Sequence, residues 1–191
     1  MQQQPDNTFI YDQLKQLLLQ LHKVDEAIAL YRQVMQQQPS NTAAYNDLAA
    51  LLMQQNKPEE AIALYQQRLQ QQPNNVSAYR NLAMLLMQQN KLEEAIALYR
   101  QVIQQQPSDL PAYGNLAALL VRQNKPQDAI TMYRQGIQQD PQNPSLYDPL
   151  ASLLLQQNQV NEAIALYRQA IQQKPDNSPF YKKLADLLLQ L

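Results

Sequence analysis

The chain contains no cysteine, a single histidine and only two glycines among its 191 residues. Without cysteine it can form no disulfide, no thiolate nucleophile and no cysteine-ligated zinc site. The two isolated glycines, Gly114 and Gly136, cannot build a glycine-rich phosphate loop. His22 has no companion residues for a metal cluster or a nucleophile–base pair, and its position between two predicted helices is that of a turn residue. We therefore predict that the chain is not an enzyme and holds no cofactor or metal.

An excess of charge of one sign and long hydrophobic runs are also absent. Fifteen basic and sixteen acidic residues give a formal net charge of -1, whereas nucleic-acid binding needs clustered positive charge. No apolar run approaches the roughly 18 residues of a membrane span. The first residues, MQQQPDN, lack the basic and apolar pattern of a secretion signal. We expect no nucleic acid and no membrane as partner, and a cytoplasmic location.

What the chain does contain is a fixed period of 34 residues. Proline keeps this period at Pro5, Pro39, Pro73, Pro107, Pro141 and Pro175. Two tyrosine series keep it as well, at Tyr11, Tyr45, Tyr79, Tyr113, Tyr147 and Tyr181, and at Tyr31, Tyr65, Tyr99, Tyr133 and Tyr167. Such a period predicts stacked supersecondary units that form one solenoid rather than separate globular domains.

Each repeat has the pattern of two helices. In residues 76–90 the apolar residues follow the i, i+3, i+4, i+7 spacing of one helix face, at Tyr79, Leu82, Ala83 and Leu86. A second amphipathic segment covers residues 92–106, and Pro107 ends the connection because proline cannot continue a helix. Alanine recurs where the two helices should approach most closely. The tyrosines are expected to fill gaps between helices, with their hydroxyls reaching the surface.

This pattern, Tyr-x2-Leu-Ala-x2-Leu, then Ala-x3-Tyr, then Pro, resembles the tetratricopeptide repeat (TPR) family. Tyrosine, alanine and leucine stand where that family usually has tryptophan, glycine and an aromatic residue. The resemblance covers the whole chain, 1–191, as a single array with repeats 8–41, 42–75, 76–109, 110–143 and 144–177 and a terminal helix at 178–191. It implies an all-α fold, a right-handed α-solenoid of antiparallel helix pairs, in which the first helices line a concave groove.

Helical geometry predicts which first-helix residues face a partner in that groove. Successive residues turn by about 100°, so positions 2, 5, 6, 9 and 13 of a repeat point away from the buried positions 4, 7, 8 and 11. The apolar position 12 flanks them. We expect a protein or an extended peptide to bind there, and the candidate contact residues are Asn46, Asp47, Arg80, Asn81, Met84, Asn115 and Arg122.

Asn81 and Asn115 occupy equivalent positions in adjacent repeats. Each carboxamide offers a donor and an acceptor, which would match one peptide unit of an extended ligand. The pair is similar to a short stretch of an asparagine ladder known in the family, although Asp47 and Pro149 interrupt the series here. The alternative is that both are simply solvated polar residues. The pattern with which some TPR proteins clamp chaperone C-termini is absent from every three consecutive repeats.

Several residues depart from the repeat pattern, and three of them bear on the packing and start of particular helices. Arg68 stands where other repeats have small or apolar residues, so its stem should run along an interface to reach water. Gly136 stands at the same position and should weaken its helix by about 1 kcal/mol relative to alanine. Pro149 falls near a helix start, and we expect that helix to begin late, with Asp148 as its cap.

The last helix resembles an interior first helix, and solenoid ends normally need a polar cap. Association through an open end is therefore an alternative function, a self-associating scaffold or homo-oligomer, with Leu187, Leu188 and Leu191 as the candidate contacts. A third possibility is that the array recruits substrates for a larger enzyme whose catalytic domain is absent from this chain.

Overall fold

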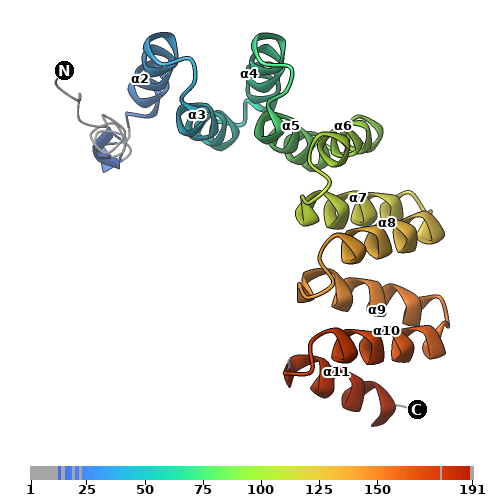
Figure 1. Cartoon of the computed structure of the whole chain (residues 1–191). Helices are drawn as coiled ribbons and strands as arrows, with labels where there is room; N and C mark the ends of the chain where they lie inside the picture. The colour runs from blue at the N-terminus through green and yellow to red at the C-terminus, as the bar shows by residue number, and fades with distance from the viewer. Residues whose placement is uncertain (1–12, 14–15, 19, 22, 177, 190–191) are drawn as a thin grey trace, which may run out of the picture. The chain divides into compact units, whose positions relative to one another are not determined.

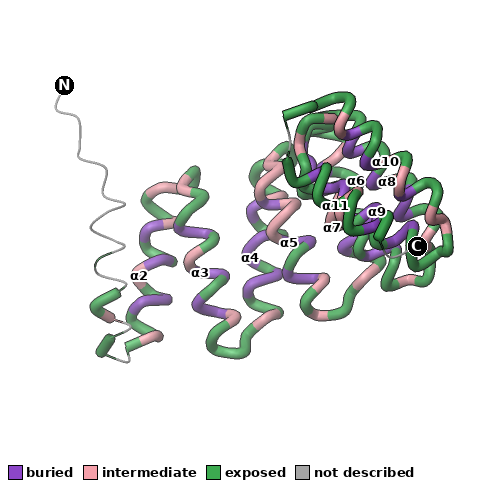
Figure 2. The backbone as a smooth tube through the Cα atoms, turned by 90° about the horizontal axis from the view of Figure 1, so that it is seen from below, coloured by how far each residue is buried: buried purple, intermediate pink, exposed green. Residues whose placement is uncertain are grey.

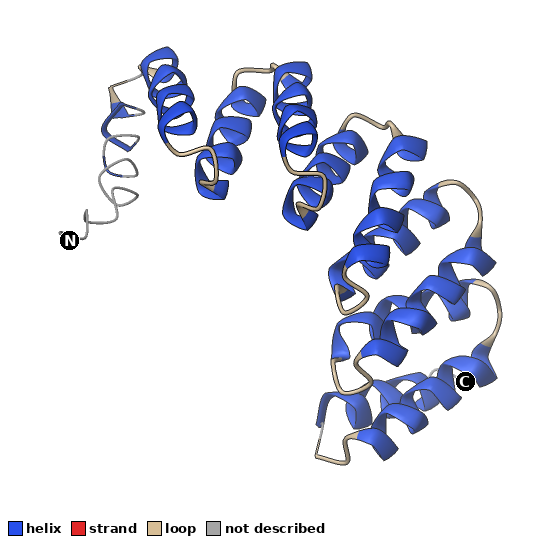
Figure 3. Ribbon diagram, turned by 45° about the horizontal axis from the view of Figure 1, so that its top comes forward, coloured by secondary structure: helices blue, strands red, loops and turns tan. Residues whose placement is uncertain are grey.

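The computed structural model describes residues 13, 16–18, 20–21, 23–176 and 178–189, and all its regular elements there are helices (Figures 1 and 3). The α-helices are α2 (Val24–Gln37), α3 (Thr42–Gln54), α4 (Pro58–Gln71), α5 (Val76–Gln88), α6 (Leu92–Gln105), α7 (Leu110–Arg122), α8 (Pro126–Gln139), α9 (Tyr147–Gln156), α10 (Val160–Gln173) and α11 (Ser178–Leu189). A short 3-10 helix, η1 (Pro144–Leu146), precedes α9. His22 and Leu191 lie outside the described residues.

The odd-numbered helices are the first helices of their repeats, and the even-numbered helices are the second helices. The predicted helix pairs and the 34-residue period are thus confirmed as an all-α array of helix hairpins. The chain divides into two compact units, residues 1–73 and residues 74–191, here called unit 1 and unit 2. Each unit is described by itself.

Polar caps determine where the first helices begin. The side chains of Asn41, Asn75 and Asp109 each accept a hydrogen bond from the backbone N–H three residues further on, at 3.1, 2.9 and 3.1 Å. These bonds satisfy one of the backbone donors that a helix leaves open at its N-terminus. The periodic polar residue two places after each proline is therefore a start signal for α3, α5 and α7.

A left-handed asparagine ends each described first helix from α3 to α9. These residues have φ between 56° and 59° and are Asn56, Asn90, Asn124 and Asn158. Around Asn56, the backbone N–H of Lys57 donates to the carbonyl of Leu52 at 2.9 Å, and that of Asn56 donates to Met53 at 3.0 Å. This pair of bonds is the Schellman motif, which turns the chain sharply into the second helix.

Small side chains lie between the paired helices. Alanine is almost completely buried on the first helices, at Ala49, Ala83, Ala117 and Ala151, and on the second helices, at Ala61, Ala95, Ala129 and Ala163. Figure 2 shows the buried residues along the faces where neighbouring helices meet. A larger residue at these positions would separate the two helix axes.

Both glycines of the chain make room for one leucine. A Cβ atom at Gly136 would collide with the Leu146 side chain and would come within 2.9 Å of Tyr113 Cβ. A Cβ atom at Gly114 would lie 3.2 Å from Leu146 Cδ2. Earlier repeats have alanine at the Leu146 position, namely Ala44, Ala78 and Ala112. Packing against Leu146 therefore requires glycine at position 136, although glycine lowers the helix propensity of α8.

Two sequence expectations need correction. Arg68 does not reach water, because its buried guanidinium donates to the carbonyl oxygens of Pro39 and Ser40 and lies 4.5 Å from the centre of the Tyr45 ring. Carbonyl oxygens and an aromatic face take the place of water around the charge. Helix α9 begins at Tyr147, so Asp148 is not its cap.

Helix α9 does begin late, as expected, because η1 occupies positions 1–3 of its repeat, where α3, α5 and α7 have their first turn. The side chain of Asn143 accepts a hydrogen bond from the backbone N–H of Ser145 at 3.0 Å, and this closes the 3-10 turn that leads into α9. Pro149 then falls within the first turn of α9, where its missing N–H removes no intrahelical bond.

Replacing Gly136 by alanine should destabilise the protein by about 2 kcal/mol, because overpacking against Leu146 outweighs the gain in helix propensity. In a Leu146→Ala background the same replacement should cost less, because only the close contact with Tyr113 remains. Urea denaturation of the four members of this double-mutant cycle measures the coupling. Stabilisation by Gly136→Ala in the unmodified chain would contradict this packing account.

Candidate peptide-binding surface

Large apolar side chains that are exposed occur only in first-helix segments among the described residues. They are Leu17, Leu21, Met84, Val121, Leu155, Tyr181, Leu188 and Leu189. The described second helices expose mainly glutamine and charged residues instead. Hydrophobic residues exposed on one kind of helix only are typical of a surface with a partner.

In unit 2 four of these residues form a series. Val121 on α7, Leu155 on α9 and Leu189 on α11 all occupy position 12, and Met84 on α5 occupies position 9, one helical turn away from position 12. We call Met84, Val121, Leu155 and Leu189 the first-helix surface. The helices that carry them follow one another along unit 2, separated by the second helices (Figure 3).

Polar residues at positions 5 and 6 bind tyrosines of the second helices. In unit 2, Asn115 Nδ2 donates to the Tyr99 hydroxyl at 3.1 Å, and the Tyr167 hydroxyl donates to Asp148 Oδ1 at 2.8 Å. In unit 1, the Tyr65 hydroxyl donates to Asn46 Oδ1 at 2.8 Å. These tyrosine hydroxyls therefore pair with polar side chains of the first helices, a pairing that the sequence analysis did not predict. The signal was present, because tyrosine at position 24 accompanies asparagine or aspartate at position 5 or 6.

These pairings leave Asn115 able to accept a hydrogen bond. Its amide nitrogen binds Tyr99, and among the described residues its oxygen accepts no hydrogen bond. Asn81 and Asp47, at the equivalent position of the preceding repeats, are half-buried and also have interaction partners. The hydrogen bond to Tyr99 thus orients the Asn115 side chain, and the amide oxygen of Asn115 is available to a ligand.

Burial and these hydrogen bonds perturb the tyrosines. Burial raises the pKa of Tyr99 from 10.0 to about 12, partly offset by the hydrogen bond from Asn115. Burial, together with the Asp148 carboxylate, raises the pKa of Tyr167. Burial alone raises the pKa of Tyr133. All three side chains therefore stay neutral at physiological pH and serve as hydrogen-bonding groups.

Tyr133 differs from its counterparts because its repeat offers no polar partner. Gly114 stands at position 5 of the same repeat and Pro149 at position 6 of the next, and neither has a side-chain donor or acceptor. Among the described residues, the Tyr133 hydroxyl makes no hydrogen bond, although the side chain is buried.

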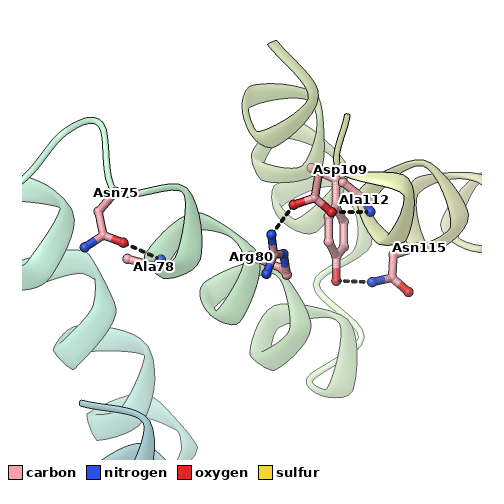
Figure 4. A network of polar contacts seen from close by, with 7 residues as sticks. Asn75, Ala78, Arg80, Asp109, Ala112 and Asn115 are labelled. Carbon is pink, nitrogen blue, oxygen red and sulfur yellow. Dashed lines mark hydrogen bonds and ion pairs between the residues drawn. The ribbon is translucent and has the colours of Figure 1, made fainter. Parts of the chain in front are cut away.

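Arg80 is held by a buried carboxylate. Its guanidinium forms an ion pair with Asp109, whose side chain is only 1% exposed and also caps α7 through the Ala112 N–H at 3.1 Å (Figure 4). Removing one partner of such a pair leaves an uncompensated buried charge. The charge of Arg80 is therefore neutralised within the protein, and the residue connects α5 with the start of α7.

The remaining predicted contact residues are not part of the first-helix surface. Arg122, at the end of α7, donates to Asn90 Oδ1 at 2.8 Å, and both side chains are exposed. Of the predicted end residues, Leu187 is buried and Leu188 is exposed, while Leu191 lies outside the described residues. Asn46 and Asp47 belong to α3 of unit 1, and the other described candidates belong to unit 2.

Unit 1 contains a pocket that sequence reasoning missed. It has a volume of about 530 Å³ and lies between α2, α3 and α4. Tyr45, Leu48 and Leu52 contribute apolar walls, and Arg32 and Glu60 form an ion pair of 3.0 Å beside them. Nothing in the periodic pattern marks it, because its lining residues are ordinary members of the repeat.

Metal-binding clusters and membrane-spanning helices are both absent from the described part of the chain. No group of three or more histidine, cysteine, aspartate or glutamate side chains is placed to hold a metal ion there. No helix among the described residues has both the length and the apolar character needed to cross a membrane.

Helix hairpins of this sequence pattern and period define a tetratricopeptide repeat protein, a class of protein-interaction scaffolds. Within that class, residues 10–191 match the family described as the Cilia and flagella-associated protein 70 C-terminal domain, and the chain belongs to this family. No curated protein matches the sequence.

Several solved structures share the fold. The MamA protein is 19% identical, with a TM-score of 0.67, over 92% of this chain and 96% of that one. TTC0263, a thermophilic TPR protein of Thermus thermophilus, is 20% identical, with a TM-score of 0.57, over 93% and 96%. YrrB, described as a TPR protein with an unusual peptide-binding site, is 16% identical, with a TM-score of 0.59, over 91% and 89%. At these identities the likeness concerns the fold.

Replacing Tyr167 by phenylalanine should cost about 1 kcal/mol of folding free energy, because the hydrogen bond to Asp148 is lost. Tyr99→Phe should cost a similar amount. Tyr133→Phe is the matched control and should change stability by less than about 0.5 kcal/mol, since its hydroxyl makes no bond to the described residues. Urea denaturation measures all three. Equal losses in the three variants would show that hydroxyl pairing does not distinguish the repeats.

Proposed function

We propose that this chain is a protein-interaction scaffold that binds an extended peptide segment along the first helices of unit 2. The observation that carries the proposal is the distribution of exposed apolar residues. Met84, Val121 and Leu155 are solvent-exposed on successive first helices, while the described second helices of the same unit expose no large apolar side chain. Covering this surface would remove apolar area from water, which favours binding.

The polar residues beside the first-helix surface support an extended ligand. Asn115 is oriented by Tyr99 and can accept a hydrogen bond from a ligand backbone N–H. Asn81 lies at the equivalent position one repeat earlier. Contacts to the ligand backbone would be independent of ligand sequence, and the apolar contacts would select its side chains.

The charges of unit 2 favour a ligand without strong net charge at this place. Arg80 is neutralised by Asp109, and Lys183 is paired with Asp148 at 2.9 Å. Arg80 is proposed to act by holding α5 and α7 in register rather than by binding a ligand anion. YrrB, a protein with a similar fold, is described as having a peptide-binding site, which supports the ligand class.

Replacing Val121 and Leu155 by glutamine should weaken peptide binding at least about tenfold, because each change removes apolar contact of about 1–2 kcal/mol. The probe is a fluorescent peptide selected from a display library against the whole chain, with affinity measured by anisotropy. Gln135→Ala, an exposed change on α8, is the control and should leave affinity unchanged. Unchanged affinity in the Val121→Gln and Leu155→Gln variants would place the peptide elsewhere.

Replacing Asn81 and Asn115 by alanine should weaken binding of the same peptide about fivefold to tenfold while helicity by circular dichroism stays unchanged, because two hydrogen bonds to the ligand are lost. Tyr99→Phe separates the two roles of Asn115, since it removes the Tyr99–Asn115 hydrogen bond and keeps the amide. If the affinity falls as far in Tyr99→Phe as in the single variant Asn115→Ala, this result would contradict a direct contact between Asn115 and the ligand.

A further inference from the structure

Tyr133 is the exception among the position-24 tyrosines, because its hydroxyl has no hydrogen-bond partner among the described residues. The hydroxyls of Tyr65, Tyr99 and Tyr167 pair with asparagine or aspartate side chains of first helices, and Tyr31 also has an interaction partner. The Tyr133 side chain is only 7% exposed. A buried polar group normally has a hydrogen-bond partner, and the described part of the chain supplies none here.

The unpaired hydroxyl of Tyr133 is nevertheless accessible from solvent. Among the described residues, the side-chain polar atoms that are completely buried and lack a hydrogen bond are Arg80 Nε and Gln159 Oε1. The Tyr133 hydroxyl is not one of them, so a group from outside the protein can reach it. Burial raises the pKa of Tyr133, and the hydroxyl therefore stays protonated and able to donate at physiological pH.

The place of the missing partner lies on the first helices of unit 2. In the other repeats the tyrosine pairs either with position 5 of its own repeat or with position 6 of the next. For Tyr133 these residues are Gly114 and Pro149. A Cβ atom at Gly114 would have Leu146 Cδ2, at 3.2 Å, as its only close contact beyond its chain neighbours and the α7 backbone. We call the space left by the missing side chain, bordered by Leu146, the Gly114 gap.

The Gly114 gap belongs to the face of unit 2 that is proposed to bind a peptide. Gly114 and Val121 are seven residues apart on α7, which is close to two helical turns, so they lie on the same face of that helix. Pro149 is exposed on α9, the helix that carries Leu155. A peptide bound against Val121 and Leu155 can therefore place one of its side chains in the Gly114 gap.

The groups that occupy this place in other repeats indicate the chemistry of the ligand. Position 5 is a carboxamide in Asn46 and a carboxylate in Asp148, and each accepts a hydrogen bond from the tyrosine of its own repeat. The charge of Asp148 is balanced by Lys183, at position 6 of the next repeat, at 2.9 Å. The residue that corresponds to Lys183 beside the Gly114 gap is Pro149, which has no charge. A carboxylate there would lose hydration without gaining this counter-ion, whereas a neutral carboxamide needs none.

We propose that the Gly114 gap binds the side-chain carboxamide of an asparagine or glutamine of the bound peptide, with the Tyr133 hydroxyl donating a hydrogen bond to its carbonyl oxygen. The ligand thereby supplies the group that position 5 supplies in other repeats. This inference rests on the proposed function and adds a sequence preference to it, since the apolar contacts at Val121 and Leu155 do not select a polar ligand residue.

The test is a double-mutant cycle between protein and peptide. A randomised peptide library is selected by display against the whole chain, and each asparagine and glutamine of the selected fluorescent peptide is replaced in turn by leucine. One of these replacements should weaken binding about fivefold, because a hydrogen bond is lost. Tyr133→Phe should weaken binding of the original peptide by a similar factor. In the Tyr133→Phe protein, the same peptide replacement should have no further effect.

Two protein variants serve as controls for the cycle. Tyr65→Phe, in unit 1, removes a hydroxyl that already pairs with Asn46 and should leave the affinity unchanged. Gly114→Asn restores the carboxamide that Asn46 provides in its repeat, and it should abolish the preference of the protein for carboxamide over leucine in the peptide. Urea denaturation of each variant shows that it is folded under the binding conditions.

The outcomes separate this inference from the proposed function. If binding depends on Val121 and Leu155 but no peptide carboxamide is coupled to Tyr133, the inference is overturned and the proposed function stands; the hydroxyl is then bonded to water only. A selected peptide without asparagine or glutamine overturns the inference in the same way. Binding that does not depend on Val121 and Leu155 contradicts the proposed function and this inference with it. Coupling of about fivefold confined to one carboxamide, without an effect of Tyr65→Phe, is the expected result.

Discussion

The structure depends on the close approach of two helices at a pair of small residues in each repeat. Alanines such as Ala83 on α5 and Ala95 on α6 are completely buried at this contact. The Schellman turn at Asn90 directs the second helix back along the first. Once that hairpin is closed, the apolar residues that remain on each helix can be covered only by a neighbouring repeat, and the array follows from this requirement.

The same requirement gives the two kinds of helix different side-chain environments. Second helices use their tyrosines to hold polar residues of first helices, as Tyr99 holds Asn115 and Tyr167 holds Asp148. These hydrogen bonds connect the first helices to the second helices. The first helices expose Met84, Val121 and Leu155 to solvent. A polar side chain that its own hydrogen-bond partner already holds, such as Asn115, loses less conformational entropy when a ligand binds.

Most of the fold could be predicted from the sequence, because the 34-residue period repeats each structural signal several times. The proline and the apolar spacing locate each helix of the third repeat to within a few residues. Contacts between residues far apart in the sequence could not be predicted from the period. The space that Gly136 leaves for Leu146 depends on a pair of departures that compensate each other. The burial of Arg68 depends on its contact with Tyr45, a regular member of the tyrosine series. Likewise, positions 5 and 6 were found by helical geometry, but the neutralisation of Arg80 by Asp109 requires the packing of α5 against the start of α7.

The central claim is that the first helices of unit 2 are the binding side of the scaffold. The most direct test is to map backbone amide chemical-shift changes by NMR when a display-selected peptide is added to the protein. The account predicts that the largest changes fall on α5, α7 and α9, around Met84, Asn115, Val121 and Leu155. Changes concentrated on α6, α8 and α10, with the first helices unaffected, would contradict it.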